Sequence, residues 1–251
     1  PEFAWNDFDG DGKSDLPIFY PLTGGWFVKS PEGSSVVPGW QWGYKGVKPV
    51  AGDFNGDGTA DLSVFDLKSG KWYINAVLSP NKGAVPMGIL ANGWQWGFMG
   101  AQPIAGDYNN NNINDPGVYN PFDGRWYIRS LSGDVLHFGT QWGYKGAQPI
   151  PGDYDGNGVM DLTVYDPQTG MWYMKFNFPA TPASKRPALE ALAQRWGFPG
   201  SIAVPGDYNG DGMADLAVYS RYDGRWYILS LGGVPLDRNG GFPSLQVLAF
   251  M

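Results

Sequence analysis

The sequence lacks several features on which common functional classes depend. It contains no cysteine and a single histidine, and only 16% of its residues are charged. Without cysteine, neither a disulfide framework nor a thiol nucleophile can form. No apolar run approaches the roughly 18 residues that a membrane-spanning helix needs, so we expect no membrane insertion. No signal-like segment follows Pro1, which indicates a processed or trimmed chain.

The composition favours an all-β fold. Glycine (38 residues) and proline (21) are frequent, and aromatic residues make up 16% of the 251 residues. Low charge combined with many aromatic side chains argues against disorder, and frequent Gly and Pro suit short strands joined by many turns. The net charge of −7 disfavours nucleic acid as a partner.

The chain consists of five copies of one unit. Each copy begins with an acidic segment such as GDFNGDGTADL at Gly52, and the copies start near residues 6, 52, 106, 152 and 206. An apolar strand and a turn follow, and then a strand that opens with two aromatic residues. These aromatic pairs are Trp26/Phe27, Trp72/Tyr73, Trp126/Tyr127, Trp172/Tyr173 and Trp226/Tyr227. A Trp-Gly pair precedes the next copy, at Trp42, Trp96, Trp142 and Trp196.

Four short strands in about 50 residues correspond to one blade of a β-propeller. We therefore predict a five-bladed β-propeller of four-stranded antiparallel blades that forms one domain over residues 1–251. A linear β-solenoid is the alternative, but its turns are usually shorter.

The insertions and the C-terminus carry further expectations. The second and fourth units have eight extra residues, for which we expect a loop at Ser79–Gly93 and one or two helical turns at Pro187–Gln194. The segment from Gly241 resembles the one from Gly197, so we expect an inner strand there that completes or braces the first blade. The alternative is a fragment of a longer repeat array.

The acidic segments have the spacing of calcium-binding loops. In the first copy, four aspartates occupy loop positions 1, 3, 5 and 9, and alternate residues of a tight loop direct their side chains inward. Position 7 needs only its backbone carbonyl, which explains the variety of residues there, and Gly at position 6 permits the sharp turn. An EF-hand has Glu at position 12, where this chain has Ile18 or Val. We expect Asp at position 9 to supply that ligand instead.

We predict up to five Ca²⁺ ions, one per blade. The expected ligand residues, loop by loop, are Asp7, Asp9, Asp11, Lys13, Asp15; Asp53, Asn55, Asp57, Thr59, Asp61; Asp107, Asn109, Asn111, Ile113, Asp115; Asp153, Asp155, Asn157, Val159, Asp161; and Asp207, Asn209, Asp211, Met213, Asp215. The third loop is expected to bind most weakly, because it has two carboxylates and Asn112 replaces its Gly. The alternative is a set of metal-free Asx turns, against which the oxygen ligands at all four side-chain positions of every copy argue.

These loops also explain the acidity of the chain. Fifteen of the 24 acidic residues lie in them, so five bound calcium ions would change the net charge from −7 to about +3. The negative net charge of the metal-free chain is therefore no evidence that it binds a positively charged partner.

The loop pattern, followed by a strand and repeated at blade spacing over nearly the whole chain, resembles the FG-GAP/VCBS repeat family, which includes the propeller of integrin α-subunits. The resemblance implies one Ca²⁺ in each loop between the first two strands of a blade, and a secreted or cell-surface location. Seven blades are usual in that family, so five is a departure. The chain is also similar to calcium-containing propeller lectins that bind sugars between blades. Members of the family include adhesins, lectins and enzyme appendages.

No catalytic constellation stands out in the sequence. The only histidine, His137, lies in an apolar strand-like stretch, where a packed or surface position is more common than a general base. The serines lack a G-x-S-x-G context. Four acids outside the loops occupy the repeated turns, where turn chemistry accounts for them: Asp66, Asp123, Asp166 and Asp223. We therefore predict no enzymatic activity.

The expected ligand surface is the face opposite calcium. Two of the loops there pair an aromatic ring with a long donor, namely Tyr44/Lys45 and Tyr144/Lys145. Such pairs suit sugars, whose C–H faces stack on rings while their hydroxyls form hydrogen bonds. The competing interpretation is that both tyrosines cap strand ends, that the repeated tryptophans fill the space between blades, and that Gln41, Gln95 and Gln141 satisfy backbone groups.

Two functional hypotheses follow. The first is a non-catalytic, lectin-like or adhesive module that binds a glycan or protein ligand. The second is a structural or protein-interaction propeller of a larger secreted protein or enzyme appendage.

Overall fold

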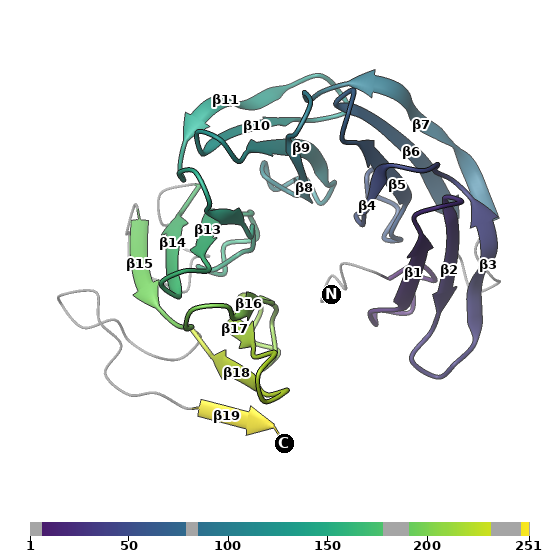
Figure 1. Ribbon diagram of the computed structural model, residues 1–251. Coiled ribbons are helices and arrows are strands. Elements are labelled where there is room, and N and C mark those ends of the chain that lie inside the picture. The colour runs from purple at the N-terminus through teal and green to yellow at the C-terminus, as the bar shows by residue number, and fades with distance from the viewer. Residues whose placement is uncertain (1–6, 79–84, 178–190, 232–246, 251) are drawn as a thin grey trace. The chain divides into compact units, whose positions relative to one another are not determined.

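The structure is a computed structural model of the 251-residue chain, and it describes residues 7–78, 85–177, 191–231 and 247–250. All the regular secondary structure in these ranges is β-strand, and the strands form five antiparallel sheets (Figure 1). Within the same ranges, no helix is long and apolar enough to cross a membrane. The prediction of an all-β, five-bladed β-propeller is confirmed.

Four of the five sheets have four strands, and the first has three. The first sheet contains β1 (Leu16–Tyr20), β2 (Gly25–Lys29) and β3 (Ser35–Gln41). The second contains β4 (Val47–Val50), β5 (Leu62–Asp66), β6 (Lys71–Leu78) and β7 (Val85–Gln95). The third contains β8 (Gln102–Gly106), β9 (Asp115–Asn120), β10 (Arg125–Arg129) and β11 (Val135–Gln141). The fourth contains β12 (Gln148–Pro149), β13 (Leu162–Asp166), β14 (Met171–Lys175) and β15 (Ala191–Arg195). The fifth contains β16 (Ile202–Ala203), β17 (Leu216–Tyr219), β18 (Trp226–Leu229) and β19 (Val247–Phe250).

The chain divides into two compact units. The first comprises Pro1–Asp107, Asn111–Asn120 and Trp126–Thr140, and the second comprises Tyr108–Asn110, Pro121–Arg125 and Gln141–Met251. The first unit thus holds the first two sheets and most of the third, and the second unit holds the last two.

Each unit has a hydrophobic core that the repeat builds in the same way. In the first unit, Trp72 lies between Phe65 and Phe54, with ring centroids 5.2 and 6.3 Å away. In the second unit, Trp172 lies between Tyr165 and Tyr154 at 5.1 and 6.4 Å. All six side chains are buried. Since aromatic contacts of this kind add about 0.5–1.5 kcal/mol beyond area burial, the tryptophans that open the aromatic pairs of the second and fourth blades, Trp72 and Trp172, are structural anchors.

The tryptophans also form a repeated hydrogen-bond ladder. The Nε1 atom of the first Trp of a unit donates to the carbonyl of its Trp-Gly tryptophan, as from Trp72 to Trp96 (2.9 Å) and from Trp172 to Trp196 (2.6 Å). The Trp-Gly tryptophan in turn donates to the next blade, as from Trp196 to the carbonyl of Tyr227 (3.1 Å). The indole N–H of Trp96 is the exception, since it is buried and has no hydrogen-bond partner among the described residues. Most buried indole N–H groups have an acceptor, so the bonds above explain why the tryptophans that form them recur.

The glycine in the turn between the second and third strands of a blade is required by the close approach of the Trp-Gly backbone. Gly70, at the turn between β5 and β6, has a φ of +73°, and a Cβ there would lie 2.3 Å from the carbonyl carbon of Gly97. Both the left-handed φ and the contact exclude a larger side chain.

Both expectations for the insertions are wrong where the structure describes them. Residues 79–84 and 187–190 lie outside the described residues. The remainder of Ser79–Gly93 is part of β7, which pairs with the eight-residue β6. Residues 191–194 are extended in β15, where Ala191 pairs with Lys175 and Gln194 with Trp172. Pairing along the open edge of the preceding strand outweighs the local helix propensity of this segment.

The expected role of the C-terminus is also wrong. Strand β19 pairs with β18, with Val247 opposite Leu229 and Phe250 opposite Trp226, so it is the fourth strand of the fifth sheet. This hairpin joins neighbouring strands, which is more common than a connection to a distant sheet. The described part of the first sheet accordingly has no inner strand beside β1.

Candidate metal centres

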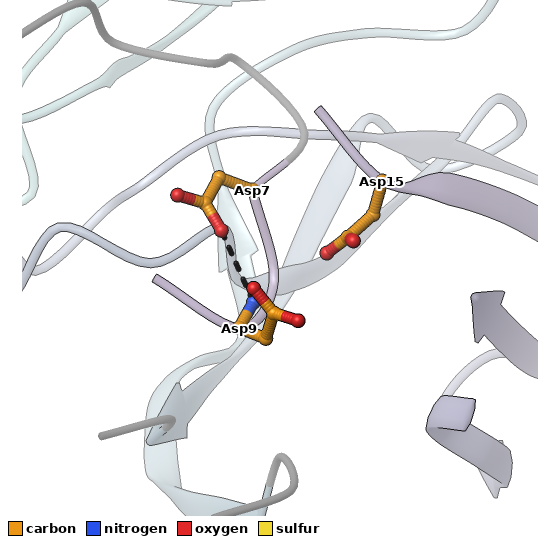
Figure 2. Close-up of side chains that lie close together, drawn as sticks. All are labelled: Asp7, Asp9 and Asp15. Carbon is orange, nitrogen blue, oxygen red and sulfur yellow. Dashed lines mark hydrogen bonds between the residues drawn. The ribbon is translucent and has the colours of Figure 1, made fainter. Parts of the chain in front are cut away.

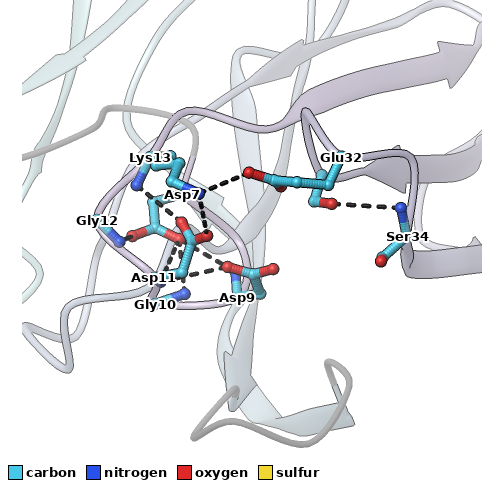
Figure 3. A network of polar contacts seen from close by, with 9 residues as sticks. Asp7, Asp9, Gly10, Asp11, Gly12, Lys13, Glu32 and Ser34 are labelled. Carbon is cyan, nitrogen blue, oxygen red and sulfur yellow. Dashed lines mark hydrogen bonds and ion pairs between the residues drawn. The ribbon is translucent and has the colours of Figure 1, made fainter.

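The first aspartate of each loop is fixed by backbone N–H groups. Asp7 Oδ1 accepts the amides of Asp9 (3.2 Å), Gly10 (2.6 Å) and Asp11 (3.2 Å), and Oδ2 accepts the amide of Gly12 at 2.8 Å (Figure 3). The bond from position 6 to Oδ2 of position 1 recurs at 2.8 Å in three further loops, from Gly58, Gly158 and Gly212. The loop thus winds around its first carboxylate and presents the later side chains on one side.

The third loop keeps this backbone without glycine. Asn110 and Asn112 have φ values of 61° and 62°, close to the 72° and 83° of Gly10 and Gly12. Asn is among the few residues that tolerate this left-handed region. Asp107 Oδ2 still accepts the amide of Asn112 at 2.7 Å. The loss of Gly therefore leaves the loop shape unchanged, and the lower charge is what distinguishes the third loop.

The ninth position ties the loop to the third strand of its blade. Asp61 is buried, its Oδ2 accepts the amide of Phe54 at 2.8 Å, and its Oδ1 accepts the amide of Val77 at 3.0 Å. The same two bonds recur in the fourth and fifth loops, where Asp161 accepts from Tyr154 and Asn177 and Asp215 accepts from Tyr208 and Leu231.

The first loop differs at this position. Asp15 is 4% exposed, and its Oδ2 accepts the amide of Phe8 at 2.8 Å. Its Oδ1 is buried and has no hydrogen-bond partner among the described residues. Such an oxygen is rare in folded proteins, because leaving a buried acceptor unpaired costs about 1–3 kcal/mol or more.

Carboxylate oxygens converge in two loops. Asp7, Asp9 and Asp15 each offer an oxygen within 4.8 Å of the other two, and Figure 2 shows the three side chains gathered around one space. Asp153, Asp155 and Asp161 form an equivalent group. Oxygens that share a calcium ion at about 2.3–2.6 Å lie within about 5 Å of each other, so both groups fit one ion. The second and fifth loops have Asn at position 3, so fewer carboxylates converge there.

Burial makes these acids costly to ionise. It is the largest cause that raises the pKa of Asp15 to about 6, and the negative charges of Asp9, Asp7 and Asp11 raise it further. Burial likewise raises the pKa of Asp61 to about 7, with added repulsion from Asp53 and Asp57. For Asp161 the pKa rises well above its ordinary value for the same reasons. A bound cation would remove this penalty, because it compensates the charge that solvent no longer reaches.

Positions 5 and 7 complete the loop without joining the carboxylate group. Asp11 Oδ1 accepts the amide of Lys13 at 2.8 Å, and Lys13 Nζ lies 2.5 Å from Glu32 and 3.6 Å from Asp11 (Figure 3). Val159 and Met213, at position 7 of their loops, direct their side chains into buried surroundings. That placement leaves only their carbonyls for a metal. Glu32 was missed in the sequence, since it lies in a turn 19 residues after Lys13.

No family model and no curated protein matches this sequence. Membership of the FG-GAP/VCBS family therefore stays a prediction.

The predicted ligand tyrosines contact the neighbouring blade. The Tyr44 hydroxyl donates to Asp66 Oδ2 at 3.0 Å, and its ring packs edge-on against Tyr73 at 5.8 Å. Tyr144 packs on Tyr173 at 6.1 Å in the same way. Each tyrosine is about two-fifths exposed (41% and 42%). Lys45 and Lys145 are exposed beside them. The tyrosines therefore pack on the next blade and the lysines are exposed to solvent, and the role of these loops in ligand binding stays a prediction.

The polar residues that recur in the repeat form hydrogen bonds with backbone groups. Gln95 Nε2 donates to the carbonyls of Ser69 and Gly97, both at 2.9 Å, and Gln141 donates to Asp123 and Gly143. Gln41 donates to the carbonyls of Thr23 and Gly43. The turn aspartates cap their own turns, as predicted: Asp66 accepts the amide of Lys68 and Asp166 that of Gln168. His137 Nδ1 lies 3.1 Å from the Thr140 hydroxyl.

An aromatic platform in the first unit was missed in the sequence. Trp94 and Trp96 stack at 6.1 Å with an angle of 25°, and the Arg129 guanidinium lies over both rings at 5.8 and 5.6 Å. Phe138, which is 75% exposed, borders Trp96 at 6.4 Å. The available signal was Phe138, which has no aromatic counterpart at the matching positions of the other blades. The position of Arg129 holds lysine in the first and fourth blades, and Lys175 lies over Trp142 at 5.9 Å in the same way. We call Trp94, Trp96, Arg129 and Phe138 the aromatic platform.

Proposed function

We propose that this chain is a calcium-loaded, non-catalytic binding module that takes carbohydrate ligands in an extracellular setting. The observation that carries calcium binding is the convergence of Asp7, Asp9 and Asp15, with Asp15 Oδ1 buried and without a partner among the described residues. The equivalent group in the fourth loop supports it.

The donor set selects a hard cation. All ligand candidates in the loops are carboxylate, amide or carbonyl oxygens, and these suit Ca²⁺ and Mg²⁺ rather than zinc or copper. The winding loop can supply six or more oxygens, which suits calcium better than the small octahedral shell of magnesium. Loops of the extracellular type bind calcium at about 0.1–1 mM, which is why we propose a secreted or cell-surface location.

Two surfaces support a carbohydrate ligand. The Tyr44/Lys45 and Tyr144/Lys145 loops each place an exposed ammonium beside a half-exposed ring. The aromatic platform places an exposed phenyl ring and an arginine beside two indoles. Sugars are bound by such combinations, because the ring face stacks on C–H groups and the cation donates to hydroxyl or carboxylate oxygens.

A glycan array with and without millimolar calcium tests the proposal. Lys45→Ala with Lys145→Ala removes the donors of the first surface and leaves the tyrosine packing in place, so glycan retention should fall if that surface binds. Phe138→Ala is the matched change on the aromatic platform. Both variants should keep the melting temperature of the parent within about 1–2 °C, because exposed substitutions change stability by less than about 0.5 kcal/mol. Retention that survives both changes would contradict both surfaces.

A protein-interaction module is the second candidate. Strands β7 and β11 expose apolar side chains, namely Ile89 (58%), Leu90 (38%), Val135 (55%) and Phe138 (75%). Exposed apolar patches are typical of protein-binding surfaces. A calcium-loaded parent protein that retains no glycan would favour this candidate.

A further inference from the structure

In three loops, the aspartate at position 9 accepts a hydrogen bond from the backbone amide sixteen residues later in the chain. The Oδ1 atoms of Asp61, Asp161 and Asp215 accept these amides at 3.0, 3.2 and 3.2 Å, from Val77, Asn177 and Leu231. In each case the donor follows the third strand of the blade or forms its end. This bond is therefore part of the repeat.

In the first loop, proline stands at the donor position. Pro31 is sixteen residues after Asp15. The strand register is the same as in the second blade, since Leu16 pairs with Lys29 as Leu62 pairs with Asn75. Proline has no backbone N–H, and Asp15 Oδ1 is accordingly the buried oxygen without a partner among the described residues.

We propose that Pro31 makes the first loop the tightest calcium site of the chain, by leaving Asp15 Oδ1 as a ligand that no amide has already satisfied. This inference rests on the proposed calcium binding. In the second, fourth and fifth loops the amide stabilises the metal-free carboxylate, so the metal gains less when it arrives. In the first loop the metal also relieves the cost of an unpaired buried oxygen.

Orientation of the carboxylate does not offset this difference. Hydrogen bonds that orient a ligand raise metal affinity, but the orienting bond to Oδ2 is present in all four loops, from Phe8, Phe54, Tyr154 and Tyr208 at 2.8–3.0 Å. The amide to Oδ1 therefore adds competition rather than orientation.

Lys13 is a cation beside the first loop that opposes calcium binding. Its Nζ is bound to Glu32 at 2.5 Å and lies 3.6 Å from Asp11, and the lysine side chain is 57% exposed. Solvent and salt screen a charge at such exposure, whereas Asp15 is 4% exposed. The effect of Pro31 on the buried oxygen therefore exceeds that of Lys13 at the rim.

The test follows each loop separately by NMR. The amides of Gly12, Gly58, Gly158 and Gly212 donate to the first aspartate of their own loops at 2.8 Å, so their signals report Ca²⁺ binding loop by loop in the full chain. In the parent protein, the Gly12 signal should shift at a calcium concentration about tenfold lower than that for Gly158, because a hydrogen bond to a charged group changes binding by this order.

Pro31→Ala supplies the missing amide and should raise the Gly12 midpoint about tenfold relative to the parent protein. Pro167→Ala, which removes a turn proline from the fourth blade, is the matched control and should leave all four midpoints unchanged. Asn177→Pro is the reciprocal change and should lower the Gly158 midpoint. Asn177→Ala keeps the amide and controls for the lost side-chain bond to Met160.

The outcomes separate this inference from the proposed function. If all four glycine signals respond to calcium but neither Pro31→Ala nor Asn177→Pro moves the midpoint of its own loop, the role of Pro31 is wrong and calcium binding stands. If no glycine signal responds to millimolar calcium in the parent, calcium binding itself is wrong.

Discussion

Removal of calcium should lower the stability of this protein more than any single substitution outside its core. The loops hold buried carboxylates at close range, with Asp7, Asp9 and Asp15 as one group and Asp153, Asp155 and Asp161 as another. Chelation leaves these like charges together without a compensating cation. The native state then carries the full repulsion, which the extended chain does not.

The magnitude follows from mass action. With a dissociation constant of roughly 0.1 mM, about 2 mM calcium adds about 1.8 kcal/mol per site to the free energy of unfolding. The two groups of three carboxylates alone would contribute about 3.6 kcal/mol, and five independent sites about 9 kcal/mol. The larger figure equals the whole stability of a typical domain, about 5–15 kcal/mol.

Thermal unfolding by circular dichroism, in about 2 mM calcium and in excess EGTA, measures this difference. At about 2–4 °C per kcal/mol for a chain of this size, the melting temperature should fall by about 7–14 °C if two sites are filled and by about 18–36 °C if all five are. Asp155→Asn keeps the side-chain shape but removes one charge from the fourth loop, so it should reduce the calcium-dependent increment without a comparable loss in EGTA. Magnesium at the same concentration is the control ion. An identical melting curve in calcium and in EGTA would refute the reasoning.

Three further predictions address the ladder, the third loop and the pH response. Trp72→Phe should cost about 1–3 kcal/mol in equilibrium unfolding, because the Trp96 carbonyl loses the donor that the buried Trp72 provides. Trp226→Phe should cost less, since Trp226 is 37% exposed; equal losses would contradict the ladder. Asn111→Asp should tighten calcium binding at the third loop in a calorimetric titration, whereas Asn112→Gly should not, because the backbone at Asn112 already has the left-handed φ of 62°. In metal-free protein, stability should fall as pH rises from about 4 to 7: burial raises the pKa of Asp15 to about 6 and of Asp61 to about 7, so the native state binds more protons than the unfolded chain across that window. Calcium should reverse the trend, because it competes with those protons; a metal-free protein whose melting temperature rises over this range would contradict the pKa shifts.

The repeat made the blades and the loops predictable from sequence. Trp72 and Trp172 are buried at matching positions because the same pattern of apolar strand, turn and aromatic pair produces the same hairpin each time. The Asp spacing fixes the loop through backbone bonds to position 1, which depend on local geometry alone. Structure that depends on short sequence patterns of this kind can be predicted from a single sequence.

What the sequence did not reveal depends on partners distant in the chain. The segment from Ala191 has helix-forming residues but is a strand, because β14 offers it an edge. The C-terminal segment resembles an inner strand but pairs with β18. The aromatic platform joins Trp96 to Arg129, and no local pattern brings these residues together. Pro31 lies between these two cases. Its position in the repeat can be read from the sequence, but its effect on Asp15 depends on the hydrogen bonds that Val77 and Asn177 donate to the matching aspartates of their blades.

Neighbouring loops within each unit are linked by backbone hydrogen bonds, so we expect calcium binding at one loop to depend on the next. The carbonyl of Asp7 accepts the amide of Ala60 at 2.5 Å, directly before Asp61 of the second loop. The carbonyl of Asp53 accepts Asn114 at 2.7 Å in the same way, and in the second unit the carbonyl of Asp153 accepts Ala214 at 2.7 Å. An ion that orders position 1 of one loop therefore also fixes the amide that precedes position 9 of the next. The entropic cost of ordering the shared backbone would then arise once for two loops, so we expect calcium binding at neighbouring loops to be cooperative. Loss of the first site should thus weaken calcium binding at the second loop more than at the fifth.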